Sequence, residues 1–151
     1  MGIVDWFRRT FVPLRRDDPR FGRMLFQRMD GKHGPSYWEC SGTFAGQEVE
    51  YFVDAEENGP SDLQREHVRL LEARWKELEP RLDRFLAARQ GSRELGESSA
   101  RLADWSLGSL ALRAEPRVGR GVEIGYVEVD GGELMTFEIE GLEPRALRVG
   151  D

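Results

Sequence analysis

Residues 37–60 read YWECSGTFAGQEVEYFVDAEENGP, and residues 61–89 continue as SDLQREHVRLLEARWKELEPRLDRFLAAR. In the first stretch apolar and polar residues alternate, which is the period of a strand with one buried face. In the second stretch the apolar residues recur every three or four positions, which is the period of a helix. The change of period after Pro60 predicts a sheet followed by a helix that covers it.

Three strands are predicted before this helix, at Phe21–Met29, Tyr37–Phe44 and Gln47–Asp54. The connection DGKHGP at 30–35 and the dipeptide Ala45-Gly46 both have turn chemistry, so the three strands should form an antiparallel meander. The apolar phase of the second and third strands predicts the inward residues to be Trp38, Cys40, Phe44, Val49, Tyr51 and Val53.

One long amphipathic helix is predicted from Asp62 to Arg89. Ser61, with Gln64 three residues later, forms a capping box at its start. Pro80 removes one backbone hydrogen bond, but the apolar register continues beyond it, so we expect a kink at Pro80 and not a stop. The apolar stripe of this helix should pack on the sheet.

Strands return after the helix, at Trp105–Ala114, Val122–Val129 and Leu134–Glu140, with a short fourth strand expected at 146–149. Asp130-Gly131-Gly132 is a strong hairpin signal. A bulge near Gly125 would keep the apolar residues of the strand around it on one side. The expected fold class is α+β: residues 21–151 form a single domain with a largely antiparallel sheet and the helix on one face.

Residues 1–20 form a separate amphipathic segment in this interpretation. Apolar residues recur at helical spacing over the first sixteen residues, at Ile3, Phe7, Phe11 and Leu14. A helix there would either dock on the domain or lie on a membrane surface with its arginines at the headgroups, and nearby aspartates favour docking. No run is apolar enough for a membrane span, and Asp5 interrupts any secretory signal, so a cytoplasmic location is expected.

Composition excludes several chemistries. The net charge of −6 disfavours nucleic acid as a partner, because phosphate binding depends on Lys and Arg. Cys40 is the single cysteine and is expected in the core, and two histidines cannot supply the usual zinc spacings. We therefore predict no catalytic set, no cofactor and no metal site. His33 lies in a turn and is the candidate general base if the chain is an enzyme, whereas His67 should sit at the core boundary.

Two segments carry acids without any Lys or Arg: residues 37–60 have six acids and residues 121–144 have seven. On alternating strands these acids should gather on the solvent face of the sheet. The predicted partner-binding residues are Glu39, Glu48, Glu50, Glu123, Glu128, Glu138 and Glu140. Such a face either keeps a sheet soluble or attracts a basic partner. Like charges on neighbouring strands are destabilising, which is an argument for a basic partner that relieves the repulsion, but both interpretations stay open.

A small acidic α+β chain without catalytic motifs is similar in overall type to the immunity proteins of bacterial toxin systems. The strand Tyr37-Trp38-Glu39 and the sequence PSDLQR at 60–65 resemble bacterial domains found among such immunity repertoires. Many immunity proteins block basic nuclease toxins through an acidic surface, so the resemblance implies a binding protein that neutralises a basic toxin. The alternative is a small hydrolase or other enzyme that uses carboxylates and His33.

Overall fold

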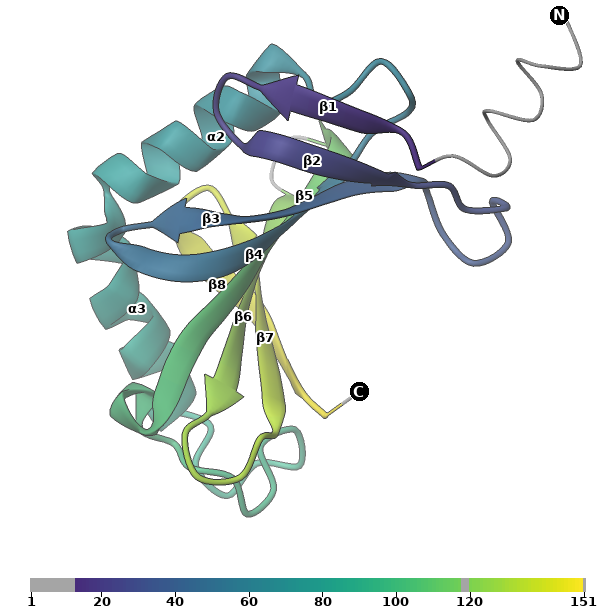
Figure 1. The fold of residues 1–151 in the computed structure, drawn as a ribbon. Coiled ribbons are helices and arrows are strands. Elements are labelled where there is room, and N and C mark those ends of the chain that lie inside the picture. Colours follow the sequence, from purple (N-terminus) through teal and green to yellow (C-terminus); the bar gives the residue numbers. More distant parts are fainter. Residues whose placement is uncertain (1–12, 118–119, 151) are drawn as a thin grey trace, which may run out of the picture.

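The computed structural model describes residues 13–117 and 120–150 (Figure 1). Within these residues eight strands form one sheet, in the same order in space as in the chain. The strands are β1 Arg15–Asp18, β2 Gly22–Gln27, β3 Tyr37–Phe44, β4 Gln47–Asp54, β5 Trp105–Arg117, β6 Arg120–Glu128, β7 Leu134–Glu140 and β8 Glu143–Val149. Between β4 and β5 lie the helices α2 Asp62–Ala73 and α3 Trp75–Ala87 and the 3₁₀ helix η1 Leu102–Asp104.

All neighbouring strands are antiparallel except β4 and β5, which pair in parallel with Tyr51 opposite Leu110. A parallel pair cannot be joined by a hairpin, so the chain crosses over through α2 and α3. The α+β class with a mostly antiparallel sheet is therefore confirmed. The sheet consists of two runs of four strands that meet at the parallel pair.

The described structure corrects the prediction at the start of the sheet. Four strands precede the helices, because Arg15–Asp18 forms β1 and pairs with β2. The prediction had placed these residues in the N-terminal segment. The amphipathic helix expected over the first sixteen residues lies mostly outside the described residues. At its end, the carbonyl of Leu14 accepts a hydrogen bond from the N–H of Phe26.

The helices lie along one face of the twisted sheet (Figure 1). All six residues predicted to point inward from the second and third strands are buried, and four of them are fully so: Trp38, Phe44, Tyr51 and Val53. The helices share this core: the ring of Trp75 packs edge-on against Phe44 at 5.1 Å, and Phe85 packs against Phe137 at 6.3 Å. One hydrophobic core thus joins both helices to both halves of the sheet.

The predicted single helix is in fact two, and the interruption is at Arg74 and not at Pro80. Arg74 has φ −110° and ψ 19°, outside helical values, whereas Pro80 lies inside α3. A straight helix over 62–87 would extend about 39 Å at 1.5 Å per residue, too long to follow a strongly twisted sheet. The apolar register continues across the break, since Leu71 and Leu78 are both fully buried.

The bulge predicted near Gly125 is also misplaced. The pairing of β6 with β7 runs without a shift from Val122 to Val127. The irregularity lies in the partner strand, where the register of β5 shifts between Leu107 and Ser109. Tyr126 continues the inward phase of β6 and is buried, so β6 needs no extra residue.

Gln64 fixes the start of α2 to the central parallel pair. Its side-chain Oε1 accepts from the N–H of Ser61, while the Ser61 hydroxyl accepts from the N–H of Gln64, which confirms the predicted capping box. The Gln64 Nε2 donates to the carbonyl of Asp54 at the end of β4 at 2.7 Å and to that of Arg113 in β5 at 3.0 Å. One buried amide therefore binds a helix cap and two strands.

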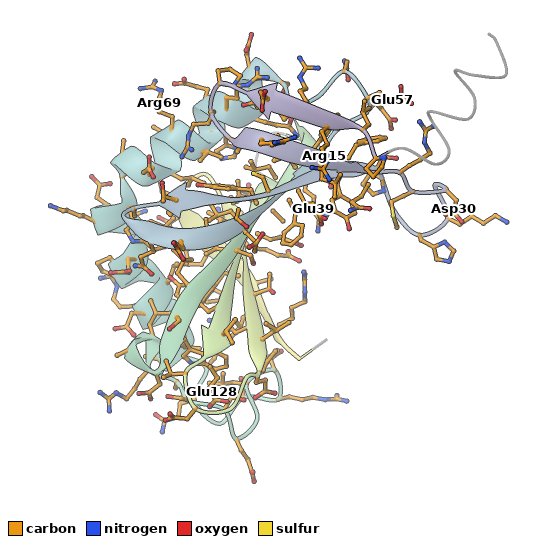
Figure 2. The ribbon with its side chains drawn as sticks, viewed as in Figure 1. Arg15, Asp30, Glu39, Glu57, Arg69 and Glu128 are labelled. Carbon is orange, nitrogen blue, oxygen red and sulfur yellow. The ribbon has the colours of Figure 1, made fainter. Side chains whose placement is uncertain are left out.

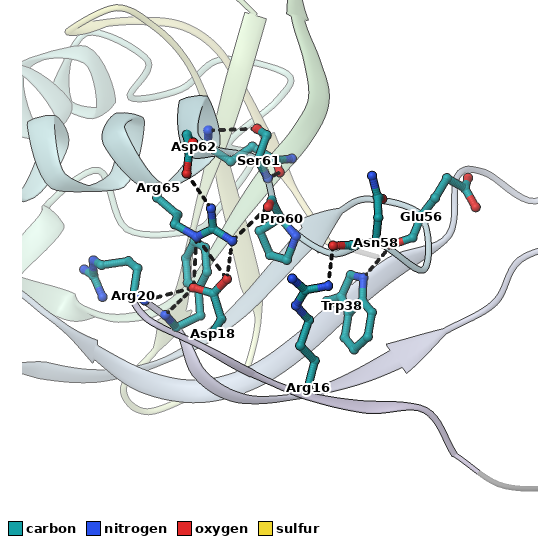
Figure 3. Close-up of polar contacts among 12 residues, drawn as sticks. Arg16, Asp18, Arg20, Trp38, Glu56, Asn58, Pro60, Ser61, Asp62 and Arg65 are labelled. Carbon is teal, nitrogen blue, oxygen red and sulfur yellow. Dashed lines mark hydrogen bonds and ion pairs between the residues drawn. The ribbon is translucent and has the colours of Figure 1, made fainter.

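Asp18 connects the edge of the sheet to α2 through its side chain (Figure 3). Its fully buried carboxylate accepts from the backbone N–H groups of Arg20 and Phe21 and from the guanidinium of Arg65, with Nη2 at 2.6 Å. Burial raises the pKa of Asp18, but these hydrogen bonds and the Arg65 charge outweigh it and hold the pKa below its ordinary value of 3.8. The β1–β2 turn is thereby fastened to α2.

We predict that Gln64→Leu destabilises the fold by about 3 kcal/mol, because the buried carbonyl of Asp54, the partly buried carbonyl of Arg113 and the N–H of Ser61 lose their partner. Each unsatisfied buried group costs about 1–3 kcal/mol. Urea unfolding followed by circular dichroism measures this change. Gln90→Leu, in the exposed turn after α3, is the matched control and should leave the midpoint unchanged. Equal midpoints for Gln64→Leu and the wild type would contradict the role given to Gln64.

Asp18→Asn should lower the free energy of unfolding by about 2 kcal/mol at pH 7, because a charged hydrogen bond to Arg65 is lost. A carboxyl group whose pKa is lower in the folded state stabilises the fold at pH values above its unfolded-state pKa. This contribution to the free energy of unfolding disappears as pH falls through the folded-state pKa. The difference between variant and wild type should therefore shrink in acid below pH 3.8.

Asp62→Asn is the control for this prediction. Asp62 pairs with the same guanidinium from a fully exposed position, so its loss should not move the melting midpoint. Thermal melts from pH 7 to pH 2 provide the comparison. Equal shifts of the melting midpoint for Asp18→Asn and Asp62→Asn would contradict the greater contribution expected from the buried carboxylate.

Candidate binding surface on the open sheet face

The face of the sheet opposite the helices is not covered by any described element, and we call it the open face (Figure 2). Strand register defines one row of side chains across it. Glu39 pairs with Phe52, Phe52 with Ala111, Ala111 with Glu123 and Glu123 with Glu138. The alternate residues of each strand, such as Tyr51 and Leu110, point into the core instead.

The predicted binding residues divide into three groups. Glu39, Glu48 and Glu50 share the open face on β3 and β4, while Glu123, Glu138 and Glu140 have the open-face phase on β6 and β7. Glu128 has the phase of the inward-facing Tyr126. It lies at the end of β6 beside Gly131, away from the other six. The structure thus brings six of the seven onto one face.

The acids on the far side of this face are paired with arginines. Arg113 of β5 contacts Asp54 at 3.5 Å and Glu123 at 2.6 Å. Arg148 of β8 contacts Glu123 at 3.1 Å and Glu138 at 3.4 Å. We call these five residues the ion-pair chain, and next to it Arg145 contacts Glu140 at 3.3 Å. The open face is therefore not acidic throughout, as the sequence had suggested.

Arg113 acts on two carboxyl groups whose pKa values move in opposite directions. Burial raises the pKa of Asp54, and the more distant Arg113 only partly opposes it. Burial also acts to raise the pKa of Glu123, but the hydrogen bond and charge of Arg113 and the charge of Arg148 hold it below its ordinary value. The difference arises because Glu123 contacts two guanidinium groups and Asp54 contacts one.

The acids on β3 and β4 are different, and we call Glu39, Glu48 and Glu50 the acidic patch. Among the described residues, none of the three forms an ion pair with an arginine or lysine. Their described hydrogen bonds come from neutral groups: the Gln27 amide donates to Glu39 at 2.8 Å, and the Ser41 hydroxyl donates to Glu50 at 2.7 Å. No described ion pair therefore offsets the charge of the acidic patch, although Arg15 of β1 lies in the same cross-strand row as Glu39.

Aromatic residues border the acidic patch. Tyr37 and Phe52 are half-buried and meet edge to face at 6.1 Å on the open face. Glu48, Glu50 and Ser41 line a shallow hollow that reaches Gly108 of β5. Partly buried aromatic rings beside charged groups are frequent features of protein interfaces. Neither the aromatic pair nor the ion-pair chain had been expected from the sequence.

The remaining candidate residues do not join the open-face groups. His33 is exposed in the β2–β3 loop and its Nδ1 lies 2.9 Å from Asp30. His67 is half-buried on α2, and burial lowers its pKa. Cys40 is in the core, where its Sγ donates to the carbonyl of Phe21, and burial raises its pKa to about 11. The thiol is therefore not ionised at neutral pH.

Two further properties concern metals and membranes. Within residues 13–117 and 120–150, no three His, Cys, Asp or Glu side chains are grouped so that they could hold a metal ion. In the same part of the chain, no helix is long and apolar enough to cross a membrane.

Comparisons of the chain with protein families, with curated proteins and with solved structures found no match.

We predict that Arg113→Gln raises the pKa of both Asp54 and Glu123, since each loses a neighbouring positive charge. In the wild type, ionised Glu123 stabilises the fold at pH values above its unfolded-state pKa, and this stabilisation is lost as pH falls through its lower folded-state pKa. In the variant the two pKa values lie closer together, so acid should remove less stabilisation than in the wild type. Carbon-13 NMR titration of the side-chain carboxyl groups measures the pKa values. Arg145→Gln, which pairs with exposed Glu140, is the control and should leave both pKa values unchanged.

Proposed function

We propose that this chain is a non-enzymatic protein-binding module of the immunity-protein type, which acts in the cytoplasm and neutralises a basic toxin through its open face. The observation that carries the proposal is the unequal pairing of acids on that face. The carboxylates of the ion-pair chain have arginine partners, whereas those of the acidic patch have none among the described residues.

A basic partner fits the acidic patch for an energetic reason. The three carboxylates lie on the same face of two adjacent strands, with Phe52 opposite Glu39, Ser41 opposite Glu50 and Thr43 opposite Glu48. None of them lies directly opposite another, but their like charges still repel one another across this face in the free protein. Positive groups of a partner would relieve this repulsion and would also speed encounter by long-range attraction. Tyr37 and Phe52 would supply the apolar contact that gives such a complex a long lifetime.

The ion-pair chain has a different part in this proposal. Each of its three acids already contacts at least one of its two arginines, so a basic partner gains less from them. Arg113 and Arg148 instead hold neighbouring strands of β4–β8 in register and keep that half of the open face polar. Most of the binding energy is therefore expected from the part of the open face on β3 and β4. Of the seven residues predicted to bind a partner, this leaves Glu39, Glu48 and Glu50 as the main contacts.

A second function has one observation in its favour. The raised pKa of Asp54 and the lowered pKa of Glu123 form the kind of separated carboxyl pair that acid–base enzymes use. Glu123, Glu138 and Arg113 also line a hollow of about 600 Å³ on the open face. However, Arg113 contacts both carboxyl groups, and His33 pairs with Asp30 in a different loop. Burial explains the raised pKa of Asp54, and structural ion pairing explains the lowered pKa of Glu123, both without catalysis, so we rank the hydrolase second.

The candidate partner for testing the proposal is a basic toxin encoded by the gene next to the one for this chain. We predict that Glu48→Lys/Glu50→Lys weakens binding to the product of this adjacent gene at least about tenfold, equivalent to about 1.4 kcal/mol. For the wild type, association should slow as salt rises towards the level at which the screening length is about 8 Å. Surface plasmon resonance at several salt concentrations measures both effects.

Two comparison variants sharpen this experiment. Glu94→Lys/Glu97→Lys changes the net charge equally but lies in the loop after α3, so its binding should match the wild type. Glu138→Lys/Glu140→Lys changes acids that already have arginine partners and should have a smaller effect than the patch variant. A patch variant that melts and binds like the wild type would refute the proposal, as would the lack of any complex with the adjacent gene product.

A further inference from the structure

One side of α2 carries apolar side chains that the fold leaves in solvent. Leu63 and Leu70 are 59% and 49% exposed. The half-buried His67 lies between them at helical spacing, so the three side chains form one line along the helix, which we call the α2 stripe. A single exposed leucine is ordinary, but an apolar line along one helix is how helices contact one another.

Two charged residues of α2 are already engaged by the sheet. Arg65 contacts the buried carboxylate of Asp18 at 2.6 Å, and Glu72 contacts Arg20 at 3.5 Å. Both contacts are at the β1–β2 turn, on the opposite side of the helix from the α2 stripe. These two charges are therefore not available to a partner that docks on the stripe.

The charges beside the α2 stripe change sign along the helix. Asp62 and Glu66 belong to the first half of α2, and Arg69 belongs to the second half. Arg69 extends outward from the helix in Figure 2. Glu66 and Arg69 form an ion pair with each other, and their side chains are 58% and 70% exposed. Exposed pairs of this kind contribute little to stability, so both groups can change partners at little cost.

This order of residues makes the solvent side of α2 complementary to itself. When two copies of a helix lie antiparallel about a two-fold axis, the first half of each faces the second half of the other. Leu63 then meets Leu70 of the second copy, and Glu66 lies beside Arg69 of the second copy. A parallel arrangement would not bring these opposite charges together. Antiparallel helices also place the positive end of each helix dipole near the negative end of the other.

We infer that α2 forms an antiparallel contact with α2 of a second copy of this chain, with Leu63 of each copy against Leu70 of the other and His67 near the two-fold axis. Burial lowers the pKa of His67, so the imidazole is neutral at neutral pH and suits an apolar contact. The helices cover the face of the sheet opposite the open face, so the acidic patch stays free in the dimer (Figure 1). The inference therefore stands or falls separately from the proposed binding function.

Sedimentation equilibrium of the full chain from about 1 µM to about 1 mM tests for the dimer. The contact is small and each copy has a net charge of −6, so a Kd on the order of 100 µM is expected. Leu63→Gln/Leu70→Gln should weaken the dimer at least tenfold and leave the melting midpoint of the dilute monomer unchanged, because both leucines are exposed.

Val129→Thr/Leu134→Gln is the matched control. It removes two exposed apolar side chains at the β6–β7 hairpin and should dimerise like the wild type. A wild-type chain that stays monomeric over the whole range would overturn the inference in favour of a different occupant of the stripe. A Leu63/Leu70 variant that dimerises like the wild type would place the interface elsewhere and would also overturn it.

Charge reversal tests the complementarity of the two helices. Glu66→Arg and Arg69→Glu should each weaken self-association, because each places like charges across the contact. An equimolar mixture of the two variants restores opposite charges and should form a heterodimer at least tenfold tighter than either homodimer. No preference for the heterodimer would contradict the contact between Glu66 and Arg69.

Disulfide trapping tests the orientation of the two helices. Chains with Leu63→Cys are mixed with chains with Leu70→Cys and oxidised, and the mixed disulfide should form in preference to either symmetric one. The native Cys40 does not compete, because it is buried and burial raises its pKa to about 11. Predominantly symmetric disulfides would indicate a parallel contact and would overturn the inference.

Discussion

The side-chain amide of Gln64 is the contact on which the rest of the fold depends. The two halves of the sheet meet at the parallel pair β4–β5, which no hairpin can hold together. Gln64 satisfies a carbonyl at the end of each of these strands and at the same time caps α2. The crossover helix is therefore attached where the sheet is joined, and both halves can share one core beneath α2 and α3.

Much of the fold was predictable because local patterns and tertiary structure agree in most places. The alternation over β3 and β4 and the Ser61 capping box were both read correctly. β1 was missed because its sequence, RRDD, has no apolar residue; it is a strand through pairing with β2 and through the burial of Asp18 against Arg65. The break at Arg74 was missed because the apolar register passes through it unchanged.

The position of the acidic residues on the open face was predictable from the sequence, but the arginines that lie among them were not. Period-two alternation placed six glutamates on one face, yet the arginines among them come from β5 and β8, outside both acid-rich segments. Their proximity follows from strand order, which the sequence pattern did not specify. Arg113 reaches Asp54 and Glu123 only because β5 lies between β4 and β6. The acidic patch remains because β3 and β4 bring no arginine to this face in the described structure.

The two edge strands of an open sheet have unpaired backbone groups to which a strand of another chain can add. In the described part of the chain these are β1 and β8. β1 is only four residues long and exposes Arg15, Arg16 and Asp17. β8 carries Pro144, and its register with β7 shifts beside Arg145. Short length, charge, proline and bulges all hinder the addition of a strand from another chain. The consequence is resistance to edge-to-edge aggregation at high concentration, even though the eight described strands all lie in one sheet.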